Sequence, residues 1–350
     1  MILSGVFSLA ARAQGDAAPL TNQEFVRLLY QLPAHPEKTV EVIAEVRRRG
    51  IGFALTDGMR SLVATKSRND ASLRRTLEEA ERRRVNPVAS RLPSAKEASE
   101  LLERARTETL AASEAMPDFI VRQLITRSYA RGNFINWRVA DHLSIAVSYR
   151  ASAGEEYKLL SVNGQPPTQD IKEGGSYEQV GGTSSTGEYV SMLAALFKPA
   201  TQATFQAVDT DTLRGARAVV YEFNVKKENS KLSIKAVGDR SVVTGYRGRI
   251  WLDRETGRVL RIEIISTEIP SDFPITAASS LIDYDWVTIN EQRYLLPSAA
   301  EIKLTIGTNE QAIHSRNEIR FRGYQKFGAE VKIIEDVEPD EEPAPKPPQK

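Results

Sequence analysis

The period of the hydrophobic residues changes near Asp118, and this change constrains the fold more than any other feature. Before it, apolar residues recur at intervals of about three to four positions, as they do along one face of a helix. After it they alternate with polar residues, as in the run Phe119, Val121, Gln123 and Ile125. The sequence therefore predicts an α+β protein in which a helical segment precedes a β domain.

The β domain is predicted to span residues 117–334. Strand-like runs follow one another, and turn sequences such as Asn163-Gly164 and Asp253 to Gly257 separate most of them. Consecutive strands joined by short turns pair in antiparallel fashion. About eleven strands in one domain require strong curvature or closure. We therefore expect a curved antiparallel sheet that forms an open half-barrel.

Residues 19–85 predict a small helical module made of several short helices. Thr21-x-x-Glu24 is a capping-box pattern ahead of one of them, and Ser67-x-x-Asp70 is a start signal for another. Each piece is too short to be stable alone, so the pieces must pack together. A proline-containing linker, residues 86–93, then leads to a bridging helix over residues 94–116, which Pro117 stops.

One helix, residues 187–197, interrupts the strands. Ser185-x-x-Glu188 predicts its start, and Met192, Leu193, Leu196 and Phe197 share one face. Such a helix has to bury its apolar face against the concave side of the sheet. By alternation, the strand residues that face it are Ile250, Leu252, Leu260, Ile262, Tyr284 and Trp286, and those that need water are Arg249, Asp253, Arg261, Glu263, Asp283 and Asp285. The apolar set is the candidate ligand-binding site.

Both ends of the chain have sequences that predict no packed structure. Residues 2–11 are apolar and Ala11-Arg12-Ala13 fits a cleavage site, which predicts an export signal over residues 1–13 and a mature start near Gln14. No Lys or Arg precedes the apolar stretch, in contrast to a complete signal. The tail, residues 335–350, is acidic and rich in proline, so we expect it to be disordered. No apolar run approaches the ~20 residues of a transmembrane segment.

The amino-acid composition excludes several classes of function. The chain contains 0 Cys, which excludes disulfides, thiolate metal sites and a cysteine nucleophile. The net charge of +1 gives no expectation of nucleic-acid binding. His35, His142 and His314 form no spaced metal motif, so we expect neither a metal nor a cofactor.

Three further features each have two interpretations. The glycine-rich stretch 174–187 is either an anion cradle or a loop that leads into a helix, and it lacks the lysine of a P-loop. Asp283 and Asp285 are either a pair of acids for glycoside hydrolysis or solvent-facing strand residues. The arginine runs 47–49 and 82–84 either bind an anionic partner or complement helix C-termini, and interleaved acids favour the second.

The segment YRGRIWLDRETGRVLRIEI, residues 246–264, resembles a hairpin of the periplasmic lipoprotein-carrier superfamily, the LolA/LolB-like proteins. More broadly, residues 117–330 resemble an uncharacterised family of exported bacterial proteins, through MPDFIVRQ, SVNGQP, TSSTGEYVSMLAALF, IPSDFPI and YLLP. The resemblance implies an open half-barrel covered by helices. It also implies non-enzymatic binding of an acyl chain or a lipidated partner in a concave apolar cleft.

Three hypotheses follow for function. The first is a periplasmic binding or carrier protein whose partner is a lipid or a lipoprotein. The second is an envelope scaffold in which the helical module binds another protein and the β domain is filled. The third is an enzyme of unknown type. An open cavity would favour the first over the second, and convergent polar groups inside that cavity would favour the third.

Overall fold

The computed structural model describes residues 18–88, 90–133, 135–167, 190–236 and 240–327. The predicted export signal at residues 1–13, the cap at Ser185 and the predicted tail at residues 335–350 lie outside this described part. Within it, no helix combines the length and the apolar character needed to cross a membrane.

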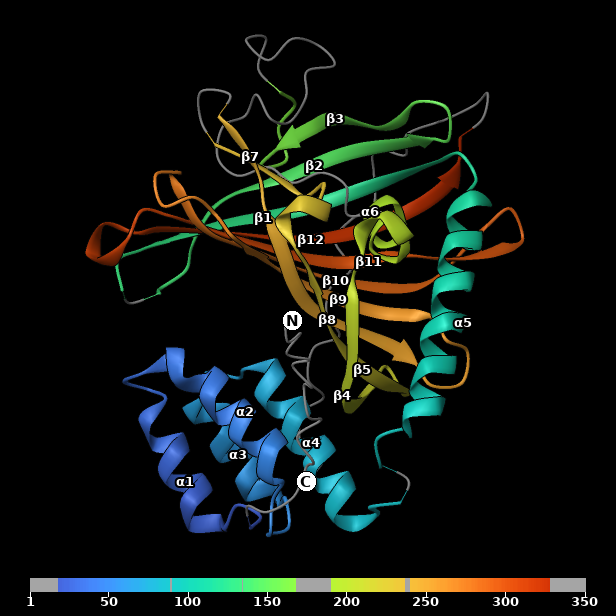
Figure 1. Cartoon of the computed structure of the whole chain (residues 1–350). Helices are drawn as coiled ribbons and strands as arrows, with labels where there is room; N and C mark the ends of the chain where they lie inside the picture. Colours follow the sequence, from blue (N-terminus) through green and yellow to red (C-terminus); the bar gives the residue numbers. More distant parts are fainter. Residues whose placement is uncertain (1–17, 89, 134, 168–189, 237–239, 328–350) are drawn as a thin grey trace, which may run out of the picture.

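The helical module predicted at residues 19–85 is present, and Figure 1 shows it beside one end of the sheet. Its elements are α1 (Asn22–Gln31), the 3-10 turn η1 (Pro36–Lys38), α2 (Thr39–Arg49), α3 (Asp57–Lys66) and α4 (Ala71–Val85). The capping box of Thr21 and Glu24 forms as predicted. Ser67 ends α3 by donating to the Val63 carbonyl, so Asp70 caps α4 and this helix begins later than its sequence signal suggests.

A core of its own holds the module together. Its fully buried side chains come from all four α-helices and from the segments between them, and they include Phe25, Leu29, Val46, Val63 and Leu73. None of these residues belongs to the core of the sheet. The module is therefore a separate folding layer, and charged groups rather than a shared apolar core join it to the rest of the chain.

The described strands form a ten-stranded antiparallel sheet and a separate two-stranded hairpin, which confirms the predicted open, curved sheet. The order in the sheet is β3-β2-β1-β12-β11-β10-β9-β8-β5-β4, and β6 pairs with β7. Their bounds are β1 Phe119–Arg131, β2 Arg138–Arg150, β3 Gly154–Val162, β4 Thr204–Leu213, β5 Ala216–Val225, β6 Ser233–Lys235, β7 Ser241–Val243, β8 Gly245–Asp253, β9 Val259–Thr267, β10 Ile275–Ile289, β11 Gln292–Ile306 and β12 Ile313–Lys326.

Two helices cover one face of this sheet, which we call the inner face (Figure 1). They are α5 (Ala95–Glu114), which begins at the predicted capping box of Ser94 and Glu97, and α6 (Val190–Phe197). The remaining turns are η3 (Pro199–Thr201), η4 (Lys227–Asn229) and η5 (Asn309–Gln311). Buried alternate residues of the strands, together with Leu101 and Ala105 of α5, form the main core on this face.

Candidate binding site

The inner face brings together eight of the ten residues that the sequence singled out. Leu193, Leu196 and Phe197 of α6 are at most 5% exposed, and Met192 is partly buried against the same core. In the same core, the strand residues Ile250, Leu252, Ile262 and Tyr284 are at most 1% exposed. The expected helix-on-sheet contact therefore exists and is closely packed, whereas ligand binding by these residues stays a prediction.

Aromatic rings line the inner face next to α6. Phe197 stacks on Phe205 of β4 with ring centroids 5.6 Å apart. Phe223 of β5 follows at 6.1 Å from Phe205, and Tyr246 of β8 at 6.1 Å from Phe223. Burial raises the pKa of Tyr246 to about 12, so its hydroxyl stays protonated. The three strand aromatics were not among the predicted site residues, although their alternation with polar neighbours in the sequence is a usable signal.

Among the described residues, few polar contacts hold α6 in place. The Thr201 hydroxyl donates to the Ala195 carbonyl over 2.5 Å at the C-terminal end. The neighbouring helix α5 is itself anchored to the sheet, because the Tyr221 hydroxyl donates to the Ala98 carbonyl over 2.7 Å. Burial of apolar side chains is therefore the main force that keeps α6 on the sheet.

Leu260 was predicted to face α6, and this prediction is wrong. A β-bulge separates the pairs Trp251–Arg261 and Leu252–Val259, so Leu260 has no direct partner on β8. The extra residue reverses the alternation, and Val259 takes the inner face in place of Leu260. Leu260 instead packs on the opposite face, the outer face, in a small cluster with Val220 and Trp251.

The prediction that Trp286 faces α6 is also wrong. It is 41% exposed and lies between two guanidinium groups, those of Arg258 and Arg293, at 5.7 and 4.9 Å from its ring. Pairing of β10 with β9 reaches only Asp283, and β10 and β11 lose register between Asp283 and Tyr284. The residue left over at this shift is Ser298 of β11, and Tyr284 still faces the inner core, as Ile282 does. Alternation on β10 changes only after Tyr284, so that Val287, and not Trp286, packs against the inner core. Alternation cannot be extrapolated through such a shift.

Arg261 was expected to face water and is buried instead. Its guanidinium donates two hydrogen bonds to the Asp283 carboxylate, over 2.8 and 2.6 Å. Arg214 adds a third contact to Asp283 at 3.2 Å. This carboxylate is therefore held by arginines in a structural ion pair, which favours the structural interpretation of Asp283 over a role as a glycosidase acid.

The helical module meets the sheet at β4, its edge strand. Arg75, Glu79 and Arg83 follow one another on one side of α4, as residues four apart do. The opposing side chains belong to Asp209, Thr210 and Asp211 of β4 and to Arg217 of β5. Arg83 bonds to Asp209, Arg75 lies 3.8 Å from Asp211, and Thr210 donates to Glu79. The charged side chains of α4 thus lie opposite side chains of β4 and β5 that complement their charge.

Glu79 lies at the centre of this charged interface and is 3% exposed. Burial opposes its negative charge, but hydrogen bonds from Arg217, Thr210 and Arg82 outweigh burial and lower the pKa of the carboxyl. Arg217 donates to both carboxylate oxygens, over 2.8 and 3.0 Å. Desolvation also lowers the pKa of Arg75.

The two arginine runs lie in the last turns of α2 and α4, as the second interpretation expects, and one arginine of each run also joins the module to the sheet. Arg47 reaches Asp209 at 3.0 Å, beside Arg83 from the second run. The other members pair within the module, for example Arg84 with Glu81 at 2.8 Å. These arginines are partnered by acids of the same chain, so the runs by themselves do not indicate an anionic ligand.

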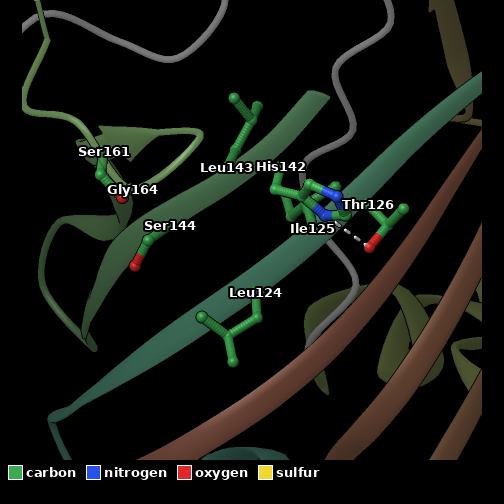
Figure 2. A pocket seen from close by; sticks show the side chains of 8 residues that line it. All are labelled: Leu124, Ile125, Thr126, His142, Leu143, Ser144, Ser161 and Gly164. Carbon is green, nitrogen blue, oxygen red and sulfur yellow. Dashed lines mark hydrogen bonds between the residues drawn. The ribbon is translucent and has the colours of Figure 1, made fainter. Parts of the chain in front are cut away.

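A hollow of about 220 Å³ lies on the outer face, between β1, β2 and the end of β3 (Figure 2). It is lined by Leu124, Ile125, Thr126, His142, Leu143, Ser144, Ser161 and Gly164. His142 and Thr126 share a hydrogen bond of 3.2 Å. His314 lies elsewhere, against Thr305, and His35 contacts Glu37 in the module. In the described part of the chain, no three His, Asp or Glu side chains are grouped so as to hold a metal ion.

Known proteins offer little likeness. No protein-family model matches the sequence, and no characterised protein does so either. Among solved structures, a DUF1329 family protein from Desulfovibrio piger ATCC 29098 aligns with a TM-score of 0.27 and 9% identity, over 67% of this chain and 97% of that one. MucB of the Pseudomonas aeruginosa MucA/MucB complex aligns with a TM-score of 0.19 and 10% identity, over 65% and 100%. These values are too low to place the chain in either family.

Proposed function

We propose that this chain is a non-enzymatic binding protein of the bacterial periplasm that takes an acyl chain, free or attached to a partner, on the inner face of its sheet. The observation that supports the proposal is α6. This eight-residue helix carries Leu193, Leu196 and Phe197 into the inner face, and it is too short to be stable without that contact. An apolar ligand that offers equal burial can therefore take its place.

The free energy gained by burying the α6 side chains is comparable to that gained by burying an acyl chain at the same place. Burying three large apolar side chains is worth roughly 5 to 9 kcal/mol, at about 1.5 to 3 kcal/mol each. An acyl chain gains about 0.8 kcal/mol per buried methylene, so about twelve methylenes give roughly 10 kcal/mol. The aromatic row of Phe205, Phe223 and Tyr246 would then contact the ligand where Phe197 now packs.

The test compares acyl binding by the wild type and by Leu196→Ala. If α6 competes with the ligand, weakening its contact should strengthen binding of a fluorescent fatty acid, by about 10-fold for each 1.4 kcal/mol lost from α6. Leu124→Ala is the matched control, because Leu124 is 43% exposed on the outer face. Native mass spectrometry of protein purified from an envelope extract shows whether lipid co-purifies.

A second candidate, an envelope scaffold with a filled sheet, is supported by the close packing of α6. In that case neither the wild type nor Leu196→Ala binds the acyl probe, and no lipid co-purifies. A scaffold would use the helical module to bind another protein. Absence of acyl binding in both proteins, together with a large loss of stability in Leu196→Ala, would rule out the carrier.

Export is part of the proposal and can be tested separately. The apolar stretch at residues 2–11 and the Ala11-Arg12-Ala13 pattern support it. N-terminal sequencing of protein from fractionated cells should give a start near Gln14 in the periplasmic fraction. Intact Met1 in the cytosol would contradict it.

A further inference from the structure

Cations gather on the outer face of the sheet where β3, β2, β1 and β12 lie side by side (Figure 1). Arg122 of β1 lies directly opposite Arg322 of β12, and Arg320 is two residues away on the same side of β12. On the other side of β1, Arg122 lies opposite Ala146 of β2, and Ala146 in turn lies opposite Lys158 of β3. We call Arg122, Lys158, Arg320 and Arg322 the basic patch.

The basic patch places like charges side by side on neighbouring strands. Like charges directly opposite one another in a sheet are destabilising. On the same strand β12, Glu318 offsets Arg316 at 2.9 Å. Across the described residues, no carboxylate lies within 4.0 Å of the charged groups of Arg320, Arg322 or Lys158, and all three are exposed. The patch is therefore a surface that an anion would stabilise.

The chain itself carries a complementary segment just beyond β12. Residues 335–342 read EDVEPDEE and hold six acids and no base. The described chain ends at Phe327, and Arg322 lies about 17 Å back along the strand. The stretch from Phe327 to Glu335 spans up to about 26 Å when extended. The acids can thus return to the basic patch without any change in the sheet.

We propose that the acidic segment 335–342 docks on the basic patch and shields it from other anions. Single exposed ion pairs are weak, but the tether gives the segment a millimolar effective concentration at the patch. The neighbouring hollow adds hydroxyl donors to the same surface, from Thr126, Ser144 and Ser161 (Figure 2). The contact is electrostatic and surface-exposed, so salt weakens it.

The chain contains 0 Cys, so a single engineered pair reports on this contact without side reactions. Ala146→Cys places a thiol within the patch, and Ala344→Cys places one just after the acids. A disulfide forms only when the two Cα atoms approach within about 7 Å. At low salt we expect it to form roughly 10-fold faster than when the six acids are replaced by their amides. About 0.5 M salt should remove the difference.

Two matched variants complete the experiment. Arg320→Gln with Arg322→Gln should slow the disulfide as much as the amide tail does. Gln206→Cys with Ala344→Cys should show no effect of the tail acids, because exposed Gln206 lies on β4, far across the sheet. Equal rates for acidic and amide tails would overturn the proposal. So would a disulfide found only between two chains, which would show that the patch takes a second copy.

Discussion

The helices α6 and α4 both lie against the sheet, and they use opposite kinds of contact. The inner-face helix α6 buries Leu193, Leu196 and Phe197 among aliphatic and aromatic side chains. The module helix α4 instead meets β4 through the charged side chains of Arg75, Glu79 and Arg83, which form ion pairs and hydrogen bonds with it. Apolar packing tolerates changes of salt and pH, whereas a charged interface depends on both. The comparison indicates that the module, and not α6, is the part that ionic conditions can release.

The largest expected effect comes from the apolar contact. Leu196→Ala should lower the free energy of unfolding of the sheet by about 2 to 5 kcal/mol, because it leaves a cavity under a side chain that is 2% exposed. Denaturant unfolding followed by tryptophan fluorescence measures the change. Leu124→Ala should stay within about 0.5 kcal/mol of the wild type. Similar losses in the two variants would show that the inner face is not closely packed.

A smaller effect is expected at the charged interface. Glu79→Gln should weaken docking of the module by about 2 kcal/mol, less than for a deeply buried pair because Arg217 and Arg82 are about one third exposed. Limited proteolysis between the module and α5, residues 86–93, should speed up by more than 10-fold, while the sheet fragment stays intact. Glu81→Gln is the control, because Glu81 pairs with Arg84 within α4. Equal rates of cleavage in Glu79→Gln and Glu81→Gln would show that the buried charge of Glu79 does not hold the module on the sheet.

Low pH should also weaken docking of the module in the wild-type protein, although less than Glu79→Gln does. Folding lowers the pKa of Glu79 below its usual value of 4.5. A lowered carboxyl pKa contributes stability that is fully present above pH 4.5 and is lost as the pH falls through the folded value. Cleavage at residues 86–93 should therefore rise below about pH 4.5, and Glu79→Gln should flatten this rise. An unchanged pH profile in Glu79→Gln would assign the acid response to other carboxyls.

The smallest effect is expected at Trp286. The predicted cleft included this residue, but its ring is 41% exposed between Arg258 and Arg293. Trp286→Ala should cost no more than about 1 kcal/mol, the loss of exposed cation–π contacts. Thermal unfolding compared with Leu196→Ala measures the contrast. A loss as large as that of Leu196→Ala would show that Trp286 belongs to the inner core after all.

The amino-acid sequence was sufficient to predict the α+β class, the open antiparallel sheet and a helical module ahead of it. Local signals carry these features, since the capping boxes at Thr21 and Ser94 and the change of period near Asp118 depend only on neighbouring residues. The same periodicity placed Leu193, Leu196 and Phe197 on the sheet.

Tertiary structure alone decided which strand residues accompany them. A bulge at Leu260 reverses the alternation on β9, and a bulge depends on the partner strand as well as on its own sequence. On β10 the alternation changes after Tyr284, where pairing with β9 has already ended. Tertiary structure also determined the partners of the arginine runs, because Arg47 and Arg83 pair with Asp209, which is more than 100 residues away in the chain. The ion-pair partner of a charged residue cannot be predicted from neighbouring residues when the partner is distant in the chain. Local sequence patterns therefore predict the helices and strands, whereas long-range contacts determine how their surfaces pair.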